Sequence, residues 1–467
     1  MKKLKKAGLT AENDLTSRLS PLTSQTRVGV ISLGCSKNLV DSEIMMGLLS
    51  GAGYTLTPSD TEAEAIIINT CGFITPAKEE AIETILKTAR LKDEGSLKVL
   101  LVSGCLAQRY GGELLAEIPE IDGVFGPGEI ESVVSCIESA MAGGRPHLVG
   151  SPEYNYNRVM PRVLTTPQHW AYLKIADGCS NRCSYCAIPG IRGGYRSRPM
   201  EVLEAETSDL LRRGIKEVIL VAQDTTAYGI DIYGRPMLSE LLRSLSGTGE
   251  TWVRVMYCYP TGFTEDLIRV MAEEENICRY IDLPLQHIND HILKSMNRRG
   301  RSEEIRRLVY NLRESIPGLT LRTTFIVGFP GEDEVKFEDL YRFVEETRFE
   351  RMGVFKYSPE EGTSAANMRD TVSEEVKEHR YDRLMTLQKK ISRSHNLLKV
   401  NTPVRVLVDG KKPGISNLYI GRTEGDAPEI DGSVLFSAGP GGTSPGEMVN
   451  VRVTRSFDYG LRGVLVP

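Results

Sequence analysis

Residues 171–186, AYLKIADGCSNRCSYC, join a short apolar run to three closely spaced cysteines. The run at 171–176 has the length and composition of a buried β-strand. Cys179, Cys183 and Cys186 follow it with the spacing C-x3-C-x2-C. If this strand belongs to a parallel barrel, the cysteines lie at its carboxyl end, where barrel enzymes place their chemistry. The stretch therefore predicts both a fold and a reactive site.

Three thiolates this close together would repel one another unless a cation neutralised them. A cubane iron–sulfur cluster takes four ligands, usually cysteines, so three cysteines leave one iron open to another ligand. A zinc site would need a fourth protein ligand, and only His169 is near in the sequence. Inert buried thiols are a third interpretation, but such thiols rarely cluster on a loop. The spacing favours a cluster over both alternatives.

The rest of residues 165–396 repeats the strand–helix pattern. Five further apolar runs are typical of buried strands, and helical segments separate most of them. These runs are 217–222, 252–256, 280–284, 319–327 and 352–357. Six β/α units predict a partial, TIM-like (β/α)6 barrel. A charged amphipathic stretch at 373–399 predicts a long helix at the end of this region.

Residues 27–141 form another α/β region, for which we expect a Rossmann-like parallel sheet. The apolar runs predict strands at 28–33, 65–69 and 98–102. Helical patterns follow the strands at about 38–50, 76–91 and 111–116.

Each of these three strands is closely followed by a cysteine, namely Cys35, Cys71 and Cys105. Parallel neighbouring strands would bring all three thiols to one edge of the sheet, where ligands of open α/β sheets bind. A glycine adjoins each cysteine and is expected to let the backbone approach a bulky inorganic core. Apolar thiols also occupy strand ends for packing reasons. Three at matching positions favour a second 4Fe-4S cluster, again with one open iron.

The remaining segments differ from the α/β regions in composition and in hydrophobic periodicity. Residues 397–466 contain short alternating strands broken by Gly and Pro, which predict a small antiparallel β-barrel. Residues 142–164 lack periodicity and are expected to be a linker. Residues 1–26 are basic without a following apolar stretch, so a disordered leader is expected rather than a secretory signal. The chain is thus predicted to be an α/β multidomain protein.

Composition excludes several classes of protein. The 467 residues carry a net charge of −5, so the chain as a whole is no nucleic-acid polycation. No apolar run approaches the roughly 20 residues that span a bilayer, so no membrane contact is expected. Nicotinamide and nucleotide-hydrolase interpretations lack support, because G-x-G-x-x-G and Walker A sequences are absent. A cytoplasmic location is expected, and nine cysteines there indicate metal ligands rather than disulfides.

The motif C-x3-C-x2-C, with Tyr185 before its last cysteine, resembles the radical S-adenosylmethionine (SAM) superfamily. There the open iron binds SAM, and an electron from the cluster cleaves SAM to methionine and a 5′-deoxyadenosyl radical. Two tri-cysteine sites followed by a small β-domain resemble the methylthiotransferase family over about residues 27–464. That resemblance implies an N-terminal methylthiotransferase domain, a radical SAM core and a C-terminal TRAM domain. It also implies two 4Fe-4S clusters, the second supplying sulfur.

Three segments resemble the RimO branch of this family, which modifies a ribosomal protein. They are 33–43 (LGCSKNLVDSE), 282–287 (DLPLQH) and 426–432 (DAPEIDG). The tRNA-modifying branch usually carries Gln-Met-Asn after the first cysteine, where this chain has Ser36, Lys37 and Asn38. The resemblance implies methylthiolation of an aspartate β-carbon in ribosomal small-subunit protein twelve, with a flavodoxin or ferredoxin as electron donor. The alternatives are a tRNA adenosine methylthiotransferase and, outside the family, a non-catalytic metal-binding or ribosome-associated protein.

The balance of acidic and basic residues in the C-terminal region indicates whether it binds RNA or protein. TRAM domains commonly bind RNA, which favours a positive surface. Residues 401–467 hold seven basic and seven acidic residues, and the acids concentrate at 424–431. An acidic segment suits a basic protein partner better than RNA, although an ordinary solvated loop fits the charge equally well. We therefore expect the ribosomal protein to bind through the TRAM domain, and RNA contact is not favoured.

Further site residues are expected around the barrel mouth. The candidates for cofactor contact are Tyr185, Gln223, Asp224, Gly328 and Glu332. The segment 328–332 (GFPGE) resembles a superfamily segment that lines the adenine pocket, although a plain Pro-Gly turn also fits. The candidates for substrate lining are Arg192, Arg198 and His287. The alternatives for these three are surface charges for the arginines and a structural role for the histidine.

Overall fold

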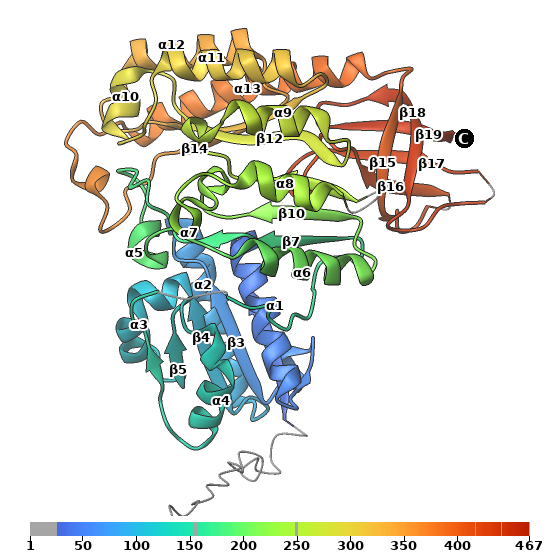
Figure 1. Cartoon of the computed structure of the whole chain (residues 1–467). Helices are drawn as coiled ribbons and strands as arrows, with labels where there is room; N and C mark the ends of the chain where they lie inside the picture. The colour runs from blue at the N-terminus through green and yellow to red at the C-terminus, as the bar shows by residue number, and fades with distance from the viewer. Residues whose placement is uncertain (1–25, 153–156, 248–250, 416, 440, 467) are drawn as a thin grey trace, which may run out of the picture.

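The computed structural model describes residues 26–152, 157–247, 251–415, 417–439 and 441–466, which form three modules along the chain (Figure 1). The predicted basic leader falls almost wholly outside these residues. The first two modules each contain a six-stranded sheet, and the third is a closed barrel. None of the helices in the described ranges has the length and hydropathy required of a membrane span.

All strands of the N-terminal sheet run parallel, in the order β2-β1-β3-β4-β5-β6. The strands are β1 (Arg27–Ser32), β2 (Thr55–Leu56), β3 (Ala65–Thr70), β4 (Val99–Gly104), β5 (Gly123–Phe125) and β6 (His147–Leu148). The helices are α1 (Ser36–Gly51), α2 (Thr75–Asp93), α3 (Cys105–Glu117) and α4 (Val133–Met141). The three long strands are those predicted. The other three have two or three residues, too few for a periodic pattern.

Helices cover both faces of this sheet, which explains the unbroken apolar run of β3. On one face, α1 and α4 pack in the same core as Ala65 and Ile67. On the other face, α2 and α3 pack with Ile66 and Ile68. Successive residues of the strand thus point to opposite cores.

The central sheet contains the six predicted strands, all parallel, in the order β14-β13-β12-β11-β10-β7. These strands are β7 (Trp170–Lys174), β10 (Glu217–Val221), β11 (Trp252–Val255), β12 (Ile277–Gln286), β13 (Thr320–Val327) and β14 (Arg351–Lys356). The intervening helices are α5 (Ile188–Arg192), α6 (Met200–Arg212), α7 (Ile230–Tyr233), α8 (Leu238–Ser246), α9 (Glu265–Glu273), α10 (Asp290–Ser295), α11 (Ser302–Ser315) and α12 (Glu334–Thr347). A small pair, β8 (Ala176–Asp177) and β9 (Arg196–Ser197), flanks the cysteine loop. Because β7 and β14 are the edges of the sheet, the barrel is partial.

The C-terminal module follows the long helix α13 (Glu374–Leu398), which matches the helix predicted at 373–399. Its strands are β15 (Pro403–Lys411), β16 (Leu418–Arg422), β17 (Ser433–Ser437), β18 (Met448–Ser456) and β19 (Gly460–Val466). They close into a barrel in the order β15-β16-β17-β19-β18. The pairing is antiparallel except between β17 and β19, which run parallel.

The two faces of the central sheet have different partners. Val218 of β10 joins the core beneath the barrel helices. The next residue, Ile219, points to the inner face and shares a core with Leu407 and Ala427 of the C-terminal module. Figure 1 shows this module at the amino-terminal ends of the barrel strands, whereas the N-terminal module lies beside β7.

The acidic segment of the C-terminal module is turned inward. Asp426 is 2 % exposed and pairs with Arg351 of β14 at 2.6 Å. Asp431 accepts a hydrogen bond from the Tyr280 hydroxyl of β12, also at 2.6 Å. The expectation that 424–431 presents an acidic surface to a basic partner is therefore wrong for Asp426 and Asp431, whose carboxylates pair inside the molecule, whereas Glu429 is exposed.

Replacing Asp426 by Asn leaves the Arg351 guanidinium buried without its carboxylate, so we expect the free energy of unfolding to fall by about 3 kcal/mol. Urea unfolding followed by tryptophan fluorescence measures this loss, because both tryptophans, Trp170 and Trp252, lie in the core shared with the C-terminal module. The control is Glu303→Gln, which breaks an exposed ion pair of α11 and should change stability by less than about 1 kcal/mol. Equal stability of Asp426→Asn and the wild type would contradict this account.

Candidate active site

Cys35, Cys71 and Cys105 lie at one edge of the N-terminal sheet. Strand β3 pairs with both β1 and β4, and Thr70 is the register partner of Gly104. Cys71 and Cys105 are therefore the next residues after a paired position, and Cys35 is the N-cap of α1. The predicted meeting of these three strand ends is confirmed.

The three thiols of this triad lie close enough to interact. Burial, with help from the neighbouring thiolates of Cys105 and Cys35, raises the pKa of Cys71 to about 11. Burial also acts to raise the pKa of Cys35, but the cations Lys37 and Arg192 outweigh it and lower this pKa overall. Cys35 is therefore the thiol of the three that ionises most readily.

The glycines that adjoin the cysteines lie tightly against neighbouring strand ends. A Cβ on Gly34, whose φ is +89°, would lie 2.6 Å from the Cβ of Cys71. A Cβ on Gly104 would lie 2.3 Å from the Asn69 side-chain oxygen. These contacts are too close for any side chain, so the glycines let neighbouring strand ends approach one another. They do not show an approach to an inorganic core.

Cys179, Cys183 and Cys186 lie on the loop between β8 and α5, at the carboxyl end of the first barrel strand. Burial, with the thiolates of Cys183 and Cys179 nearby, raises the pKa of Cys186 to about 12. Burial is also the main cause of the raised pKa of Cys179, to which Cys183 contributes. A cationic metal core would relieve this mutual repulsion.

Hydrogen bonds to other barrel loops hold this cysteine loop in place. The Asn181 side chain donates to Asp224 at 2.7 Å, and the Ser184 N–H donates to the Met296 carbonyl at 2.9 Å. Asp224, a candidate for cofactor contact, thus positions the loop between Cys179 and Cys183.

Arg298 lies beside the same loop and carries no sequence signal. Its Nη1 is 3.9 Å from the Cys183 Sγ and 3.1 Å from the Tyr185 hydroxyl. Its Nη2 donates to the Pro284 carbonyl at 2.6 Å, and its guanidinium lies 4.6 Å from the centroid of the Tyr259 ring. Positive charge is therefore fixed next to Cys183, and Tyr185 contacts the arginine that supplies it.

The geometry of the two triads does not suit a lone metal ion. Among the described residues, no three His, Cys, Asp or Glu side chains converge closely enough to hold one. A zinc ion needs its thiolates at about 2.3 Å from one point, whereas a four-iron cluster spreads its ligands over separate irons. His169, the zinc ligand considered above, instead contacts Asp409 at 2.9 Å.

Buried polar atoms without partners lie at the carboxyl ends of the barrel strands. They are Gln223 Oε1, Gln286 Oε1, His287 Nε2 and the Tyr357 hydroxyl. His287 is neutral, because burial lowers its pKa to about 3, and its Nδ1 accepts from the Asn289 N–H. Each unpaired buried atom costs about 1–3 kcal/mol, so such a group indicates a place for a ligand or water. The barrel mouth thus fits a small polar cofactor such as SAM.

Hydrogen bonds within the segment 328–332 hold it in a turn. The Glu332 carboxylate accepts from the N–H groups of Gly328 (2.5 Å) and Phe329 (3.2 Å) and pairs with Arg380 at 3.3 Å. Burial raises the pKa of Glu332 to about 7, although Arg380 opposes the rise. Both carboxylate oxygens are already engaged, so the geometry gives Glu332 a role in shaping the turn.

Arg198 is also engaged within the fold. It pairs with Glu206 of α6 at 2.5 Å and donates to the Lys174 carbonyl at 2.9 Å. Only 3 % of Arg198 is exposed, so it is neither a surface charge nor a free cation at the mouth. It fastens α6 to the first barrel strand.

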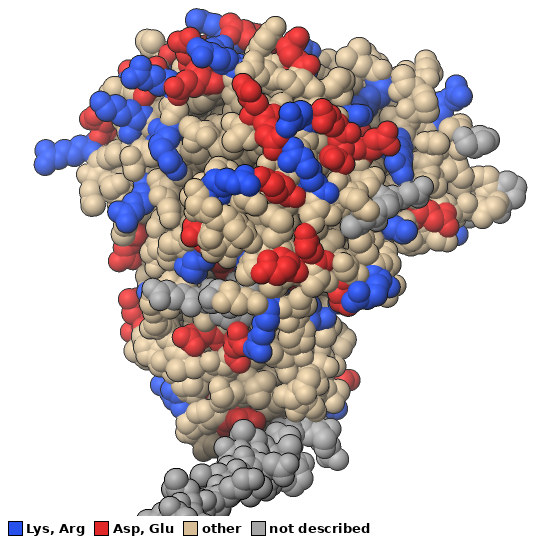
Figure 2. All heavy atoms as spheres, in the orientation of Figure 1, with Lys and Arg blue, Asp and Glu red and all other residues tan. Residues whose placement is uncertain are grey.

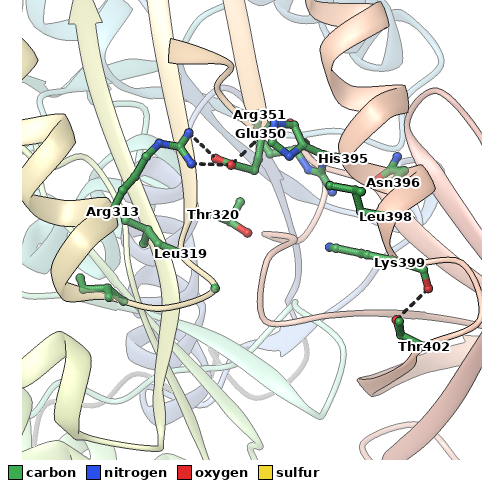
Figure 3. A pocket seen from close by; sticks show the side chains of 12 residues that line it. Arg313, Leu319, Thr320, Glu350, Arg351, His395, Asn396, Leu398, Lys399 and Thr402 are labelled. Atoms are coloured by element: carbon green, nitrogen blue, oxygen red, sulfur yellow. Dashed lines mark hydrogen bonds and ion pairs between the residues drawn. The ribbon is translucent and has the colours of Figure 1, made fainter. Parts of the chain in front are cut away.

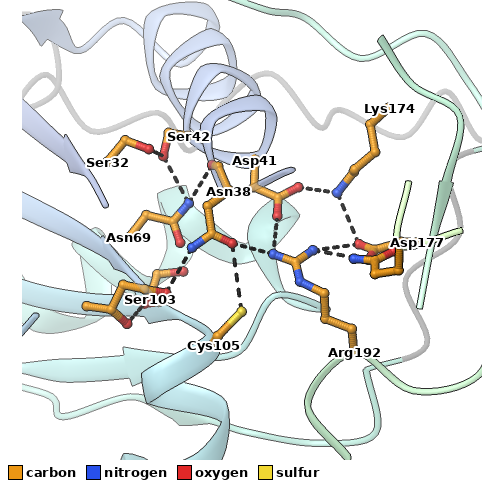
Figure 4. A network of polar contacts seen from close by, with 12 residues as sticks. Ser32, Asn38, Asp41, Ser42, Asn69, Ser103, Cys105, Lys174, Asp177 and Arg192 are labelled. Atoms are coloured by element: carbon orange, nitrogen blue, oxygen red, sulfur yellow. Dashed lines mark hydrogen bonds and ion pairs between the residues drawn. The ribbon is translucent and has the colours of Figure 1, made fainter. Parts of the chain in front are cut away.

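Arg192 lies in a polar network between the N-terminal module, close to Cys105, and the barrel (Figure 4). It belongs to α5, which directly follows the Cys186 loop, and it pairs with Asp177 at 2.9 Å. It also pairs with Asp41 of α1 at 3.0 Å and donates to the Asn38 side chain at 2.5 Å. Arg192 therefore joins the N-terminal module, beside Cys105 and Cys35, to the barrel segment that follows the Cys186 loop.

A cavity of about 380 Å³ lies elsewhere, between the central and C-terminal modules (Figure 3). Its lining includes Lys399, His395 and the ion pair between Arg313 and Glu350 at 2.9 Å. It lies at the amino-terminal ends of β13 and β14 and shares no residue with either triad. The candidate active site is at the other end of these strands.

Comparison with known proteins agrees with this division of the chain. Residues 27–126 match the uncharacterized protein family UPF0004, residues 173–344 the radical SAM superfamily and residues 401–466 the TRAM domain. A ribosomal protein uS12 methylthiotransferase RimO from Pelotomaculum thermopropionicum is 52 % identical over 441 residues, covering 94 % of this chain and 99 % of the relative. The chain belongs to the RimO family. The resemblance drawn from the cysteine motifs is thereby confirmed, and membership of the radical SAM superfamily implies SAM and a 4Fe-4S cluster.

Other RimO relatives cover the chain equally well. Those from Heliobacterium modesticaldum and Geobacter sulfurreducens are 52 % and 46 % identical, covering 94 % and 95 % of this chain and 94 % and 99 % of the relatives. A solved structure of TsrM, a radical SAM methyltransferase from Kitasatospora setae, has a TM-score of 0.55 at 16 % identity. It covers 73 % of the RimO-family chain and 77 % of its own, and at this identity it shows a shared fold alone.

Glu332 should make stability depend on pH. Its folded-state pKa is about 7 against an ordinary 4.5, so folding retains a proton that the unfolded chain releases between these values. The stabilisation is complete below about pH 4.5 and is lost as the pH rises through 7. The variant Glu332→Gln has no proton to release at this position. As the pH rises from 4.5 to above 7, its free energy of unfolding should therefore fall less than that of the wild type, and the difference should reach up to about 3 kcal/mol. Urea unfolding at several pH values measures the difference, and parallel pH profiles would rule out the raised pKa.

Proposed function

We propose that this RimO-family chain is a radical SAM methylthiotransferase that adds a methylthio group to the β-carbon of an aspartate in ribosomal protein uS12. The observation that carries the proposal is the presence of two cysteine triads, one at the carboxyl end of the first barrel strand and one at the edge of the N-terminal sheet, in modules that Arg192 joins. Relatives that match nearly the whole chain are named ribosomal protein uS12 methylthiotransferases. They favour this substrate over the tRNA adenosine of the alternative.

Each triad has a separate role in this proposal. Cys179, Cys183 and Cys186 hold the 4Fe-4S cluster of the radical SAM core, and Cys35, Cys71 and Cys105 hold a second 4Fe-4S cluster. Three thiolates leave one iron of each cluster to a non-protein ligand. When bound, the first cluster with SAM supplies a 5′-deoxyadenosyl radical, and the second supplies the sulfur.

The residues around the first triad prepare it for this task. The Arg298 guanidinium fixes a positive charge 3.9 Å from the Cys183 Sγ. The unpaired atoms of Gln223, Gln286 and His287 are proposed to bind the polar groups of SAM. Tyr185 positions Arg298 and has no separate cofactor contact in this scheme.

The ion-pair cluster that joins the N-terminal module to the barrel excludes water. The side chains that join them are all buried, with Arg192 and Asp41 each 1 % exposed and Lys174 fully enclosed. A reactive radical needs such a site, since enclosure prevents side reactions with solvent.

We assign three functional domains, residues 27–141, 165–396 and 397–466. The connecting segment 142–164, expected as a linker, also supplies β6 to the N-terminal sheet. The proposed partners are uS12 and a flavodoxin- or ferredoxin-type electron donor, and the ribosomal substrate places the enzyme in the cytoplasm. RNA contact is not part of the proposal. On the face in Figure 2, the described basic and acidic side chains are interspersed rather than gathered in the basic stripe that an RNA backbone favours.

Mass spectrometry of uS12 tests the activity. Enzyme reconstituted without oxygen and given SAM, a reductant and uS12 should replace one hydrogen of uS12 by a methylthio group, and peptide fragmentation should locate the change to an aspartate. Bulk tRNA treated in the same way is the control. Methylthiolated tRNA together with unchanged uS12 would contradict the proposal and support the alternative.

Substitution of one cysteine in each triad tests the two roles. Cys183→Ala should abolish 5′-deoxyadenosine formation, whereas Cys71→Ala should retain some of it yet abolish methylthio transfer. Iron content should fall from about eight atoms per chain to about four in either variant. Cys136→Ala, in a buried position of α4, is the control. Methylthio transfer by Cys71→Ala, or zinc in place of iron, would refute the assignment.

A further inference from the structure

A buried ammonium group reaches from the N-terminal module into the barrel mouth. Lys37, the second residue of α1, is only 8 % exposed. Its Nζ lies 3.5 Å from the centroid of the Tyr257 ring. Tyr257 stands just beyond β11, at the carboxyl end of the barrel strands. Lys37 therefore reaches from the segment beside Cys35 to the carboxyl end of the barrel strands.

Tyr257 is held in this position by its neighbours. Its φ is +62°, which a tyrosine rarely adopts. Its N–H donates to Asp282 at 3.0 Å, and its carbonyl accepts from the Thr225 N–H at 3.1 Å. Strained backbone that surrounding contacts over-determine clusters at ligand sites. Here the strain keeps an aromatic face against the Lys37 ammonium.

Lys37 differs from the other buried cations of this interface. Lys174 and Arg192 each pair with the carboxylates of Asp41 and Asp177. Within the described part of the chain, no carboxylate pairs with Lys37. An aromatic face compensates a buried cation less fully than a paired carboxylate does. Cys35 and Tyr257 are the neighbours of this charge. Lys37 therefore still lacks a carboxylate partner, which a substrate from outside the chain can supply.

We propose that Lys37 binds the side-chain carboxylate of the substrate aspartate and so determines specificity, an inference that rests on the proposed function above. The β-carbon of aspartate is bonded directly to that carboxylate, so a cation that holds the carboxylate also fixes the carbon. Lys37 is two residues from Cys35, so the fixed carbon stands beside the triad assigned to sulfur. An asparagine at the target would leave the ammonium uncompensated.

The same charge could also serve Cys35, whose thiolate it stabilises. Two measurements separate these roles. Iron and sulfide content after reconstitution reports on cluster assembly. The preference between two substrates that differ only in the carboxylate reports on substrate binding.

The experiment compares wild-type, Lys37→Met and Lys37→Arg enzymes on uS12 and on uS12 with asparagine at the target position. We expect Lys37→Met to lose about 10- to 100-fold in kcat/KM on the aspartate substrate, mainly through KM, because a hydrogen bond to a charged group is lost. Its preference for aspartate over asparagine should collapse. Lys37→Arg should keep the preference, since it keeps the cation. Lys87→Met, at an exposed position of α2, is the matched control.

An unchanged preference for aspartate in Lys37→Met would overturn the proposal, whether or not iron content falls. If the wild-type enzyme modifies neither form of uS12, the proposed function has failed. The affinities of the enzyme for the aspartate and asparagine forms of uS12 then test the role of Lys37. Tighter binding of the aspartate form that Lys37→Met abolishes supports the proposal, and equal binding of both forms overturns it.

Discussion

Four buried charges fix the relation between the first two modules. They are Asp41 of α1, Lys174 of β7, Asp177 of β8 and Arg192 of α5, all at most 2 % exposed (Figure 4). Each cation pairs with both carboxylates, so the cluster is neutral only when α1 supplies Asp41. Although burial acts to raise the pKa of Asp177, Arg192 and Lys174 hold it well below its ordinary value. A buried charge without its partner costs several kcal/mol, so the first two modules dock in the arrangement that completes the cluster.

The features of the site that could be predicted are those encoded within one short segment. The spacing of three cysteines marks one triad, and their place after apolar runs marks the other, because parallel strands share one carboxyl edge. Arg298 left no such signal, since it reaches Cys183 from 115 residues away. Strands of two or three residues, such as β2 and β6, carry no period either. Tertiary packing decides contacts of this kind, and local sequence does not encode it.

The sequence did not show whether charged side chains point to solvent or into the interior. A run of acids around Asp426 suggested an outward acidic face, yet Asp426 pairs with Arg351 in the interior. Arg198 and Glu332 were expected at the mouth, and both are committed to bonds within the fold. Residue type gives the capacity for an interaction, but composition contains no information about which side of an element meets solvent.

The packing of the C-terminal module on the inner face of the barrel limits how a polypeptide can be modified. Leu407 and Ala427 pack in the inner core, and Asp431 is hydrogen-bonded to Tyr280. The C-terminal module therefore closes the barrel at the amino-terminal ends of its strands. A ribosomal protein cannot thread through such a barrel. It has to insert its target on a protruding loop and withdraw it by the same opening. The carboxyl ends of the barrel strands are therefore the end from which a substrate approaches.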